Sequence, residues 1–240
     1  MAGQIVGAVT VAGSSIYFGA SDGSIYSLDA AEGFSNWTFK TGGKIWSTPV
    51  VSDGTLYIGS FDKKLYALNA SDGTKKWTFT ADGAIEAAPV VEGNTVYVGS
   101  NDRNLYAVDT ASGQLKWKFQ ARNFFWAEPV ARGGYIYAPS LDGQVYILKA
   151  ETGEKIAEVN LGAEVSSSPV VVNDYVVAAS DDGVVWKIDS SNKGQVLARI
   201  NEPIHAALGA NQNTVFVHTD RDLLYGVDVT TGALRTFTVK

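Results

Sequence analysis

Several residue types and patterns are missing from this chain of 240 residues. There is no cysteine, which excludes disulfides and cysteine-ligated metal sites and leaves the redox compartment open. No apolar run approaches the roughly 18 residues that a membrane span needs. Lys and Arg number 19 against 25 Asp and Glu, for a formal charge of −6, so the basic face that a nucleic-acid partner requires is not expected.

Targeting and enzyme motifs are missing as well. No signal-peptide pattern is present in Met1-Ala2-Gly3-Gln4, which predicts either a cytoplasmic protein or a sequence given without its leader or anchor. There is no Gly-rich phosphate loop and no nucleophile elbow, and the two histidines do not have zinc-site spacing. The sequence therefore predicts no catalytic residue and no metal ligand.

What the chain has instead is a repeat of forty residues. The clearest copies run from Ala67 to Trp77 and from Ala107 to Trp117, an earlier copy ends at Trp37, and weaker copies lie near 147–157, 188–197 and 226–236. Fixed-period repetition predicts one array in a single domain. Its units are 1–40, 41–80, 81–120, 121–160, 161–200 and 201–240.

Each unit contains four short apolar runs separated by turn residues. In 41–80 we expect strands at 47–51, 55–60, 65–68 and 75–79, with a tight hairpin turn at Asp53-Gly54. Four short strands in forty residues are typical of one propeller blade. The apolar residues occur on both faces of these strands, which suits a sheet packed between two others.

The shared pattern A-x-D-x-x-x-G-x-x-x-W resembles the tryptophan-docking motif of the PQQ-type (quinoprotein-like) propeller repeat. Its glycines suit a turn with positive φ. The resemblance implies an all-β, six-bladed β-propeller of four-stranded antiparallel blades, in which each docking tryptophan packs between neighbouring blades. We expect the ring to close by side-chain packing without strand exchange, and a fragment of a larger ring is the alternative. The motif residues are Trp37, Trp77, Trp117, Gly33, Gly73 and Gly113.

Aspartates recur at a spacing of forty between the second and third strands of the units. A ring of carboxylates would suit Ca²⁺, which takes oxygen ligands. Aspartate is also a standard turn residue, and we expect that role here. The residues are Asp22, Asp62, Asp102, Asp142 and Asp182.

Positions where the repeats disagree indicate a possible site. An apolar residue precedes each first strand and is predicted to be core: Ile5, Ile45, Ile85, Phe125, Val165 and Ile204. The next residue should face the other way, at the mouth of the central channel. Residues with a purely structural role at this position should be of the same type in every repeat. Their variety predicts a recognition surface, and drift at unconstrained positions is the alternative. These residues are Val6, Trp46, Glu86, Trp126, Ser166 and His205.

Repeat 121–160 departs most from the consensus. Arg122, Phe124, Trp126 and Glu128 replace smaller residues, which predicts an anchor for a peptide or protein partner. Local repacking is the alternative, because Ala157 stands where the docking tryptophan belongs.

The sequence thus predicts a monomeric, non-catalytic binding or scaffolding propeller. Its protein, peptide or small-ligand partner would lie over Trp46, Glu86, Arg122, Trp126, Glu128, Ser166 and His205. Among non-enzymatic propellers the chain resembles the lipoproteins that assist outer-membrane β-barrel assembly, which implies protein–protein contact and a periplasmic location.

Two alternatives stay open: a sensor domain of a larger receptor or kinase, and a small PQQ-dependent dehydrogenase or hydrolase. Trp46 and Trp126 could stack on a quinone, and Glu86 and Glu128 could form an acid–base pair. No cofactor is predicted, because no motif for PQQ or its Ca²⁺ is found.

Overall fold

The computed structural model describes residues 3–237, so the first two residues of repeat 1–40 and the last three of repeat 201–240 lie outside it. The chain divides into two compact units, Met1–Gln120 and Ala121–Lys240, each holding three repeats. The described residues form 24 strands. They contain no helix, and hence none with the length and apolar character to cross a membrane.

Each repeat of unit 1 forms one four-stranded antiparallel sheet, here called a blade, with its strands in sequence order. Blade 1 has β1 (Thr10–Ala12), β2 (Ser15–Gly19), β3 (Ser24–Asp29) and β4 (Ser35–Lys40). Blade 2 has β5 (Val50–Ser52), β6 (Thr55–Gly59), β7 (Lys64–Asn69) and β8 (Lys75–Thr80). Blade 3 has β9 (Val90–Glu92), β10 (Thr95–Gly99), β11 (Asn104–Asp109) and β12 (Leu115–Gln120).

Unit 2 repeats this topology in its three sheets. Blade 4 has β13 (Val130–Arg132), β14 (Tyr135–Pro139), β15 (Gln144–Lys149) and β16 (Lys155–Asn160). Blade 5 has β17 (Val170–Val172), β18 (Tyr175–Ser180), β19 (Val184–Ile188) and β20 (Gly194–Arg199). Blade 6 has β21 (Gly209–Asn211), β22 (Thr214–His218), β23 (Leu224–Asp228) and β24 (Leu234–Phe237).

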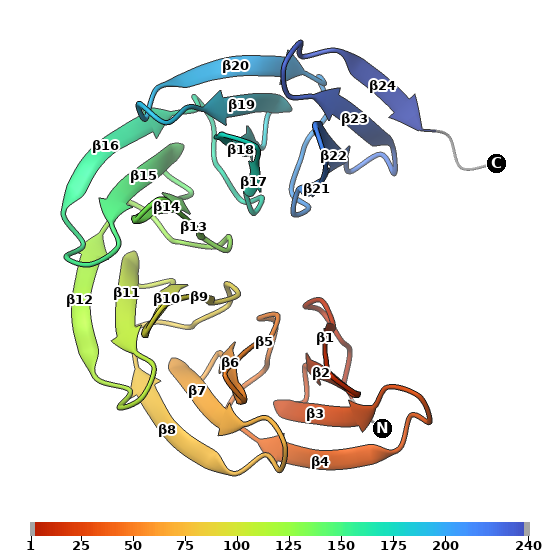
Figure 1. Ribbon diagram of the computed structural model, residues 1–240, viewed down its shortest axis with the longest axis vertical. Coiled ribbons are helices and arrows are strands. Elements are labelled where there is room, and N and C mark those ends of the chain that lie inside the picture. Colours follow the sequence, from red (N-terminus) through yellow and green to blue (C-terminus); the bar gives the residue numbers. More distant parts are fainter. Residues whose placement is uncertain (1–2, 238–240) are drawn as a thin grey trace. The chain divides into compact units, whose positions relative to one another are not determined.

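Within each unit the blades stand side by side, with their first strands at one edge and their fourth strands at the other (Figure 1). The first strands contact one another in order, β1 with β5 and β5 with β9, and likewise β13 with β17 and β17 with β21. Hydrogen bonds join these edges. Ser47 Oγ donates to Ala87 O at 3.0 Å, and Glu128 N donates to Ser168 Oγ at 3.1 Å.

The core of each unit lies between successive blades. Blade 2 has a neighbour on both faces, and all five residues of β6 are buried, which explains why its sequence is a continuous apolar run. Ile45 of blade 2 packs with Ile25 and Trp37 of blade 1. Ile204 of blade 6 packs in the same way with Val185 of blade 5.

Five of the six predicted core residues that precede the first strands are buried. Ile45 and Ile85 lie against the glycines that end β2 and β6, so closely that a Cβ there would lie 2.1 Å and 2.3 Å from them. The prediction is wrong for Ile5, which is 49% exposed. Within the described residues of unit 1, no glycine of this kind lies against Ile5. The five buried residues are Ile45, Ile85, Phe125, Val165 and Ile204.

The indole of Trp37 lies on the turn between the third and fourth strands of blade 2. Its Nε1–H donates to Ala70 O at 2.9 Å, and Tyr17 Oη donates to the same oxygen at 3.0 Å. A Cβ at Gly73 would lie 2.7 Å from the Trp37 ring. Gly73 also has φ +72°, so it is required there both for the turn and for the close approach of the ring.

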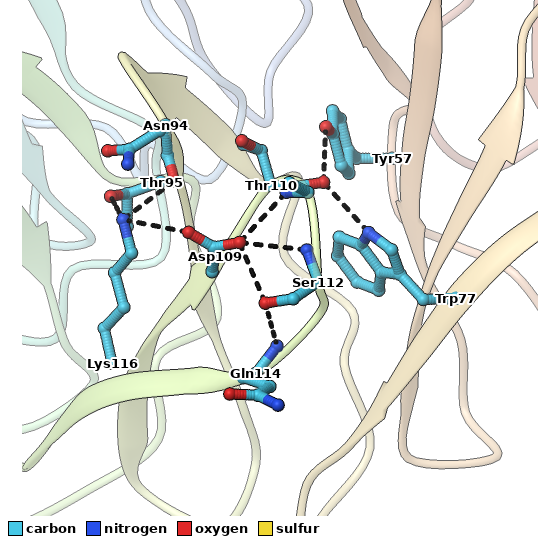
Figure 2. Close-up of polar contacts among 10 residues, drawn as sticks. Tyr57, Trp77, Asn94, Thr95, Asp109, Thr110, Ser112, Gln114 and Lys116 are labelled. Carbon is cyan, nitrogen blue, oxygen red and sulfur yellow. Dashed lines mark hydrogen bonds and ion pairs between the residues drawn. The ribbon is translucent and has the colours of Figure 1, made fainter.

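Trp77 makes the same contacts one repeat later, on the turn of blade 3 (Figure 2). Its Nε1–H donates to Thr110 O at 2.9 Å, and a Cβ at Gly113 would lie 2.6 Å from its ring. Asp109 forms the turn itself, because its Oδ1 accepts from the backbone N–H and the hydroxyl of Ser112.

Trp117 and Gly33 complete the predicted motif residues, and Trp117 has the same place on its fourth strand as Trp77. Trp117 lies opposite Ala107 on β11, and its ring is 5.6 Å from that of Tyr97 in its own blade. Gly33 has φ +74°, yet a Cβ added to it would meet nothing within 4 Å. Its positive φ is therefore the only conformational reason for glycine at position 33 in the described structure.

In unit 2, a different type of side chain donates to the turn carbonyl of the next blade. Val177 stands where blades 1 to 4 have tyrosine, and Lys187, opposite it, donates from Nζ to Val229 O of blade 6 at 3.2 Å. The Lys187 ammonium also lies 5.0 Å from the ring centroid of Tyr175, within cation–π range. The position keeps a hydrogen-bond donor to the next blade although the aromatic residue is gone.

The two motif glycines provide a matched test of the indole contact. Gly73→Ala should destabilise unit 1 by about 3 kcal/mol, since it combines a left-handed backbone cost with displacement of the Trp37 ring. Gly33→Ala should cost only about 1 kcal/mol, because it has the same backbone conformation and no ring to displace. Denaturant unfolding monitored by fluorescence measures both, and equal losses would show that the ring contact contributes little.

Candidate functional site

In blade 3, both carboxylate oxygens of Asp102, the aspartate of the second turn, accept hydrogen bonds from other parts of the fold. Asp102 Oδ1 accepts from Asn104 N at 2.8 Å, while Oδ2 accepts from Tyr106 Oη at 2.8 Å and from Asp82 N and Gly83 N at 2.9 Å and 3.0 Å. Burial alone would raise the pKa of Asp102, but these hydrogen bonds outweigh it and hold the pKa below its usual value.

Three other blades repeat this arrangement, with tyrosine–aspartate distances of 2.5–3.0 Å. The turn role is therefore confirmed at the aspartates that these hydrogen bonds hold. The described residues contain no group of three or more His, Cys, Asp or Glu that could hold a metal ion. The pairs are Asp22–Tyr26, Asp62–Tyr66 and Asp142–Tyr146.

Two of the three predicted channel-mouth residues of unit 1, Trp46 and Glu86, each contact a residue fifteen positions later in the same blade, whereas Val6 is 52% exposed. The rings of Trp46 and Phe61 meet edge to face with centroids 4.7 Å apart. Asn101 Nδ2 donates to Glu86 Oε1 at 2.5 Å. The loop before the first strand and the turn after the second strand therefore present their variable residues together.

Unit 2 repeats this pairing with different chemistry. Ser166 donates from its backbone N and from Oγ to Asp181 Oδ1, at 3.0 Å and 2.8 Å. His205 Nδ1 lies 2.9 Å and 2.8 Å from the two carboxylate oxygens of Asp220. His205 Nε2 lies 3.5 Å from Asp181 Oδ2, so the pairs of blades 5 and 6 are joined. An ionised carboxylate only accepts, and Nδ1 of His205 therefore carries a proton.

We call these couples the variable pairs. Sequence analysis found their first members and missed the second members, although the signal was present. Position 61 and its equivalents also differ from repeat to repeat, and each is chemically compatible with its partner. An aromatic residue meets an aromatic residue, an amide meets a carboxylate, and a carboxylate meets a hydroxyl or an imidazole. The variable pairs are Trp46/Phe61, Glu86/Asn101, Trp126/Leu141, Ser166/Asp181 and His205/Asp220.

Glu86 is the most buried acidic residue of the variable pairs, with 9% of its surface exposed. Burial raises its pKa, and the hydrogen bond from Asn101 acts in the opposite direction. Neither Glu86 Oε2 nor Asn101 Oδ1 has a hydrogen-bond partner among the described residues. Glu86 belongs to unit 1 and Glu128 to unit 2, so their role as an acid–base pair stays a prediction.

A pocket of about 340 Å³ opens among the variable pairs of unit 2. Trp126, which is 39% exposed, and Leu141 give it an apolar wall. Polar side chains from blades 5 and 6 complete it. Its lining residues are Trp126, Leu141, Glu164, Ser166, Asp181 and His205.

Two predicted site residues of blade 4 do not line this pocket. The Arg122 side chain is 73% exposed, and its Nη2 lies 3.8 Å from Glu158 on the fourth strand. Glu128 is half-buried beside the first strand, and burial raises its pKa to about 7. The structure therefore brings Trp126, Ser166 and His205 together and places Arg122 and Glu128 elsewhere in unit 2.

Six four-stranded antiparallel sheets with PQQ-like repeats define the β-propeller class. More narrowly, the chain belongs to the family described as outer membrane protein assembly factor BamB, whose sequence profile matches residues 21–236. This confirms the family resemblance inferred from the docking motif.

Two solved structures are similar in fold. BamB from Moraxella catarrhalis has a TM-score of 0.83 and 17% identity, with 99% of this chain and 77% of that chain covered. The computationally designed Ika8 protein has a TM-score of 0.87 and 18% identity, with 98% and 74% covered. No curated protein matches the sequence.

The raised pKa of Glu128 gives a pH-dependent prediction. The folded state holds this proton more tightly than the unfolded state, so the stability of the wild type should fall as pH rises from the unfolded pKa to about 7. Glu128→Gln should therefore be more stable than wild type by about 2 kcal/mol at pH 8 and nearly equal to it at pH 4.

Thermal unfolding across this pH range measures the difference, and Glu151→Gln, at an exposed turn of the same blade, is the control. A Glu128→Gln difference that does not depend on pH would contradict the burial of an ionisable group.

Proposed function

We propose that this chain is a non-catalytic scaffold that binds a protein partner through its variable pairs. The observation that supports the proposal is the contrast between the two parts of each blade. The tyrosine hydroxyl bonds to the turn aspartates recur in four blades, whereas the residue types of the five variable pairs differ from blade to blade. A surface that is locally ordered and chemically different at each position suits recognition of an irregular partner.

The composition of unit 2 favours a protein over a small ligand. Phe124 and Trp126 are each 39% exposed; Trp126 lines the pocket, and Phe124 O accepts from the backbone N–H of Leu141 in the pocket wall. Aromatic residues are enriched at the centre of protein interfaces, where a few of them contribute most of the binding energy. Arg122 is highly exposed at the edge of this cluster, where it would serve as a rim contact.

Family membership supports the same function at a coarser level. The family is described as an outer membrane protein assembly factor, and assembly requires contact with other proteins. By this analogy we place the chain in the periplasm at the outer membrane. The PQQ-dehydrogenase alternative has less support, since the turn carboxylate of blade 3 accepts from a tyrosine hydroxyl and backbone N–H groups.

Two phenylalanines allow a matched crosslinking test. A benzophenone amino acid at Phe124 should form adducts with proteins of a Gram-negative envelope fraction, whereas the same replacement at Phe34, which is 70% exposed in a turn of blade 1, should form few. Adducts of equal yield at both positions would contradict a defined binding surface. Gel shifts followed by mass spectrometry measure the yield.

Trp126→Ala tests the anchor itself. It should reduce crosslinking from position 124 by roughly tenfold or more, as expected for an aromatic anchor residue, without lowering the melting temperature. A large loss of thermal stability would instead show that Trp126 is part of the core of blade 4.

A further inference from the structure

We infer that the pocket of unit 2 takes the basic side chain, lysine or arginine, of a protein partner. This inference rests on the proposed binding function and specifies the chemistry of the contact. It depends on three properties of the pocket: its apolar wall, its charge and its hydrogen-bonding capacity.

The apolar wall matches the stem of a long basic side chain. Trp126 and Leu141 line one side of the pocket, and the exposed part of the indole provides a π-face. Lysine and arginine have an aliphatic stem that packs on apolar surface while the charged end remains polar. A cation above an indole face gains further electrostatic attraction.

The charge of the pocket is negative. Glu164 and Asp181 line it, and Asp220 holds His205 from behind. Glu164, Asp181 and Asp220 thus bring three carboxyl groups to one imidazole. Among the described residues no lysine or arginine lines the pocket, so a cation from outside would balance this charge.

The hydrogen-bonding groups of the pocket are mainly acceptors. The Ser166 hydroxyl already donates to Asp181, and His205 Nδ1 is directed to Asp220. Glu164 is exposed, and its carboxylate oxygens can accept. An ammonium group offers three donors and a guanidinium five, whereas an anionic ligand would meet like charge. The hydrogen bonds from Ser166 already orient the Asp181 carboxylate, so this side chain loses little conformational entropy when it binds a cation.

Short capped peptides test the assignment directly. Three peptides, acetyl-Gly-Leu-X-Leu-Gly-amide with X as lysine, norleucine or glutamate, are titrated into the full chain, and the indole N–H signal of Trp126 is followed by NMR. The lysine peptide should bind roughly fivefold more tightly than the norleucine peptide, and the glutamate peptide should bind most weakly.

Glu164→Gln should reduce the preference for lysine over norleucine about threefold, as expected for one exposed ion pair. Glu151→Gln is the matched control, because it removes the same charge from an exposed turn away from the pocket. Trp126→Leu, followed by the backbone amide signal of Ser166 because the indole signal is lost, should reduce the affinity for the lysine peptide about threefold through loss of the cation–π contact.

Equal binding of the lysine and norleucine peptides, or no change of the Trp126 signal at millimolar peptide, would overturn the inference. Equal effects of Glu164→Gln and Glu151→Gln would also overturn it, because the preference for lysine would then come only from the overall negative charge of the protein. If crosslinking from position 124 persists while the lysine preference is absent, the basic contact is wrong and the binding function stands. If crosslinking fails while the lysine preference is present, the protein-binding function is wrong.

Discussion

The indole seated on the turn of the next blade is the contact on which the repeat depends. Trp37 combines two requirements in one side chain, since its ring covers Gly73 and its N–H satisfies the carbonyl of Ala70. A large apolar ring with one polar end suits a position between two sheets. Because this contact uses the turn between the third and fourth strands, that turn must keep its shape, and its sequence motif recurs.

Unit 2 shows which part of this contact is essential. Lys187 donates to Val229 O without an indole, and Tyr137 Oη donates to Asn192 Oδ1 at 3.0 Å in the turn of blade 5. In each case a donor from one blade still meets an acceptor in the next turn. An unpaired buried carbonyl would cost more than a change of donor, which explains why the motif decays while the blade interface persists.

The fold could be predicted from the sequence because strand, turn and docking residues recur together and agree with one another. The failures have local causes. The glycine contacts that bury Ile45 and Ile85 have no counterpart at Ile5 within the described residues of unit 1. Phe61, Asn101 and Asp181 were missed because each lies fifteen residues from its partner. A strand period relates residues two apart and carries no information about contacts between a loop and a distant turn.

The pairing also bears on the alternative that the channel-mouth positions merely drifted. Independent drift would change one member of a pair and leave the other unmatched. Instead, the hydrogen bonds Asn101–Glu86, Ser166–Asp181 and His205–Asp220 all connect compatible groups. Each pair orders its own side chains, and an ordered polar group loses less entropy when it binds a partner. These hydrogen-bonded pairs thus differ in chemistry from blade to blade while each keeps an internal contact, as the proposed binding role would require.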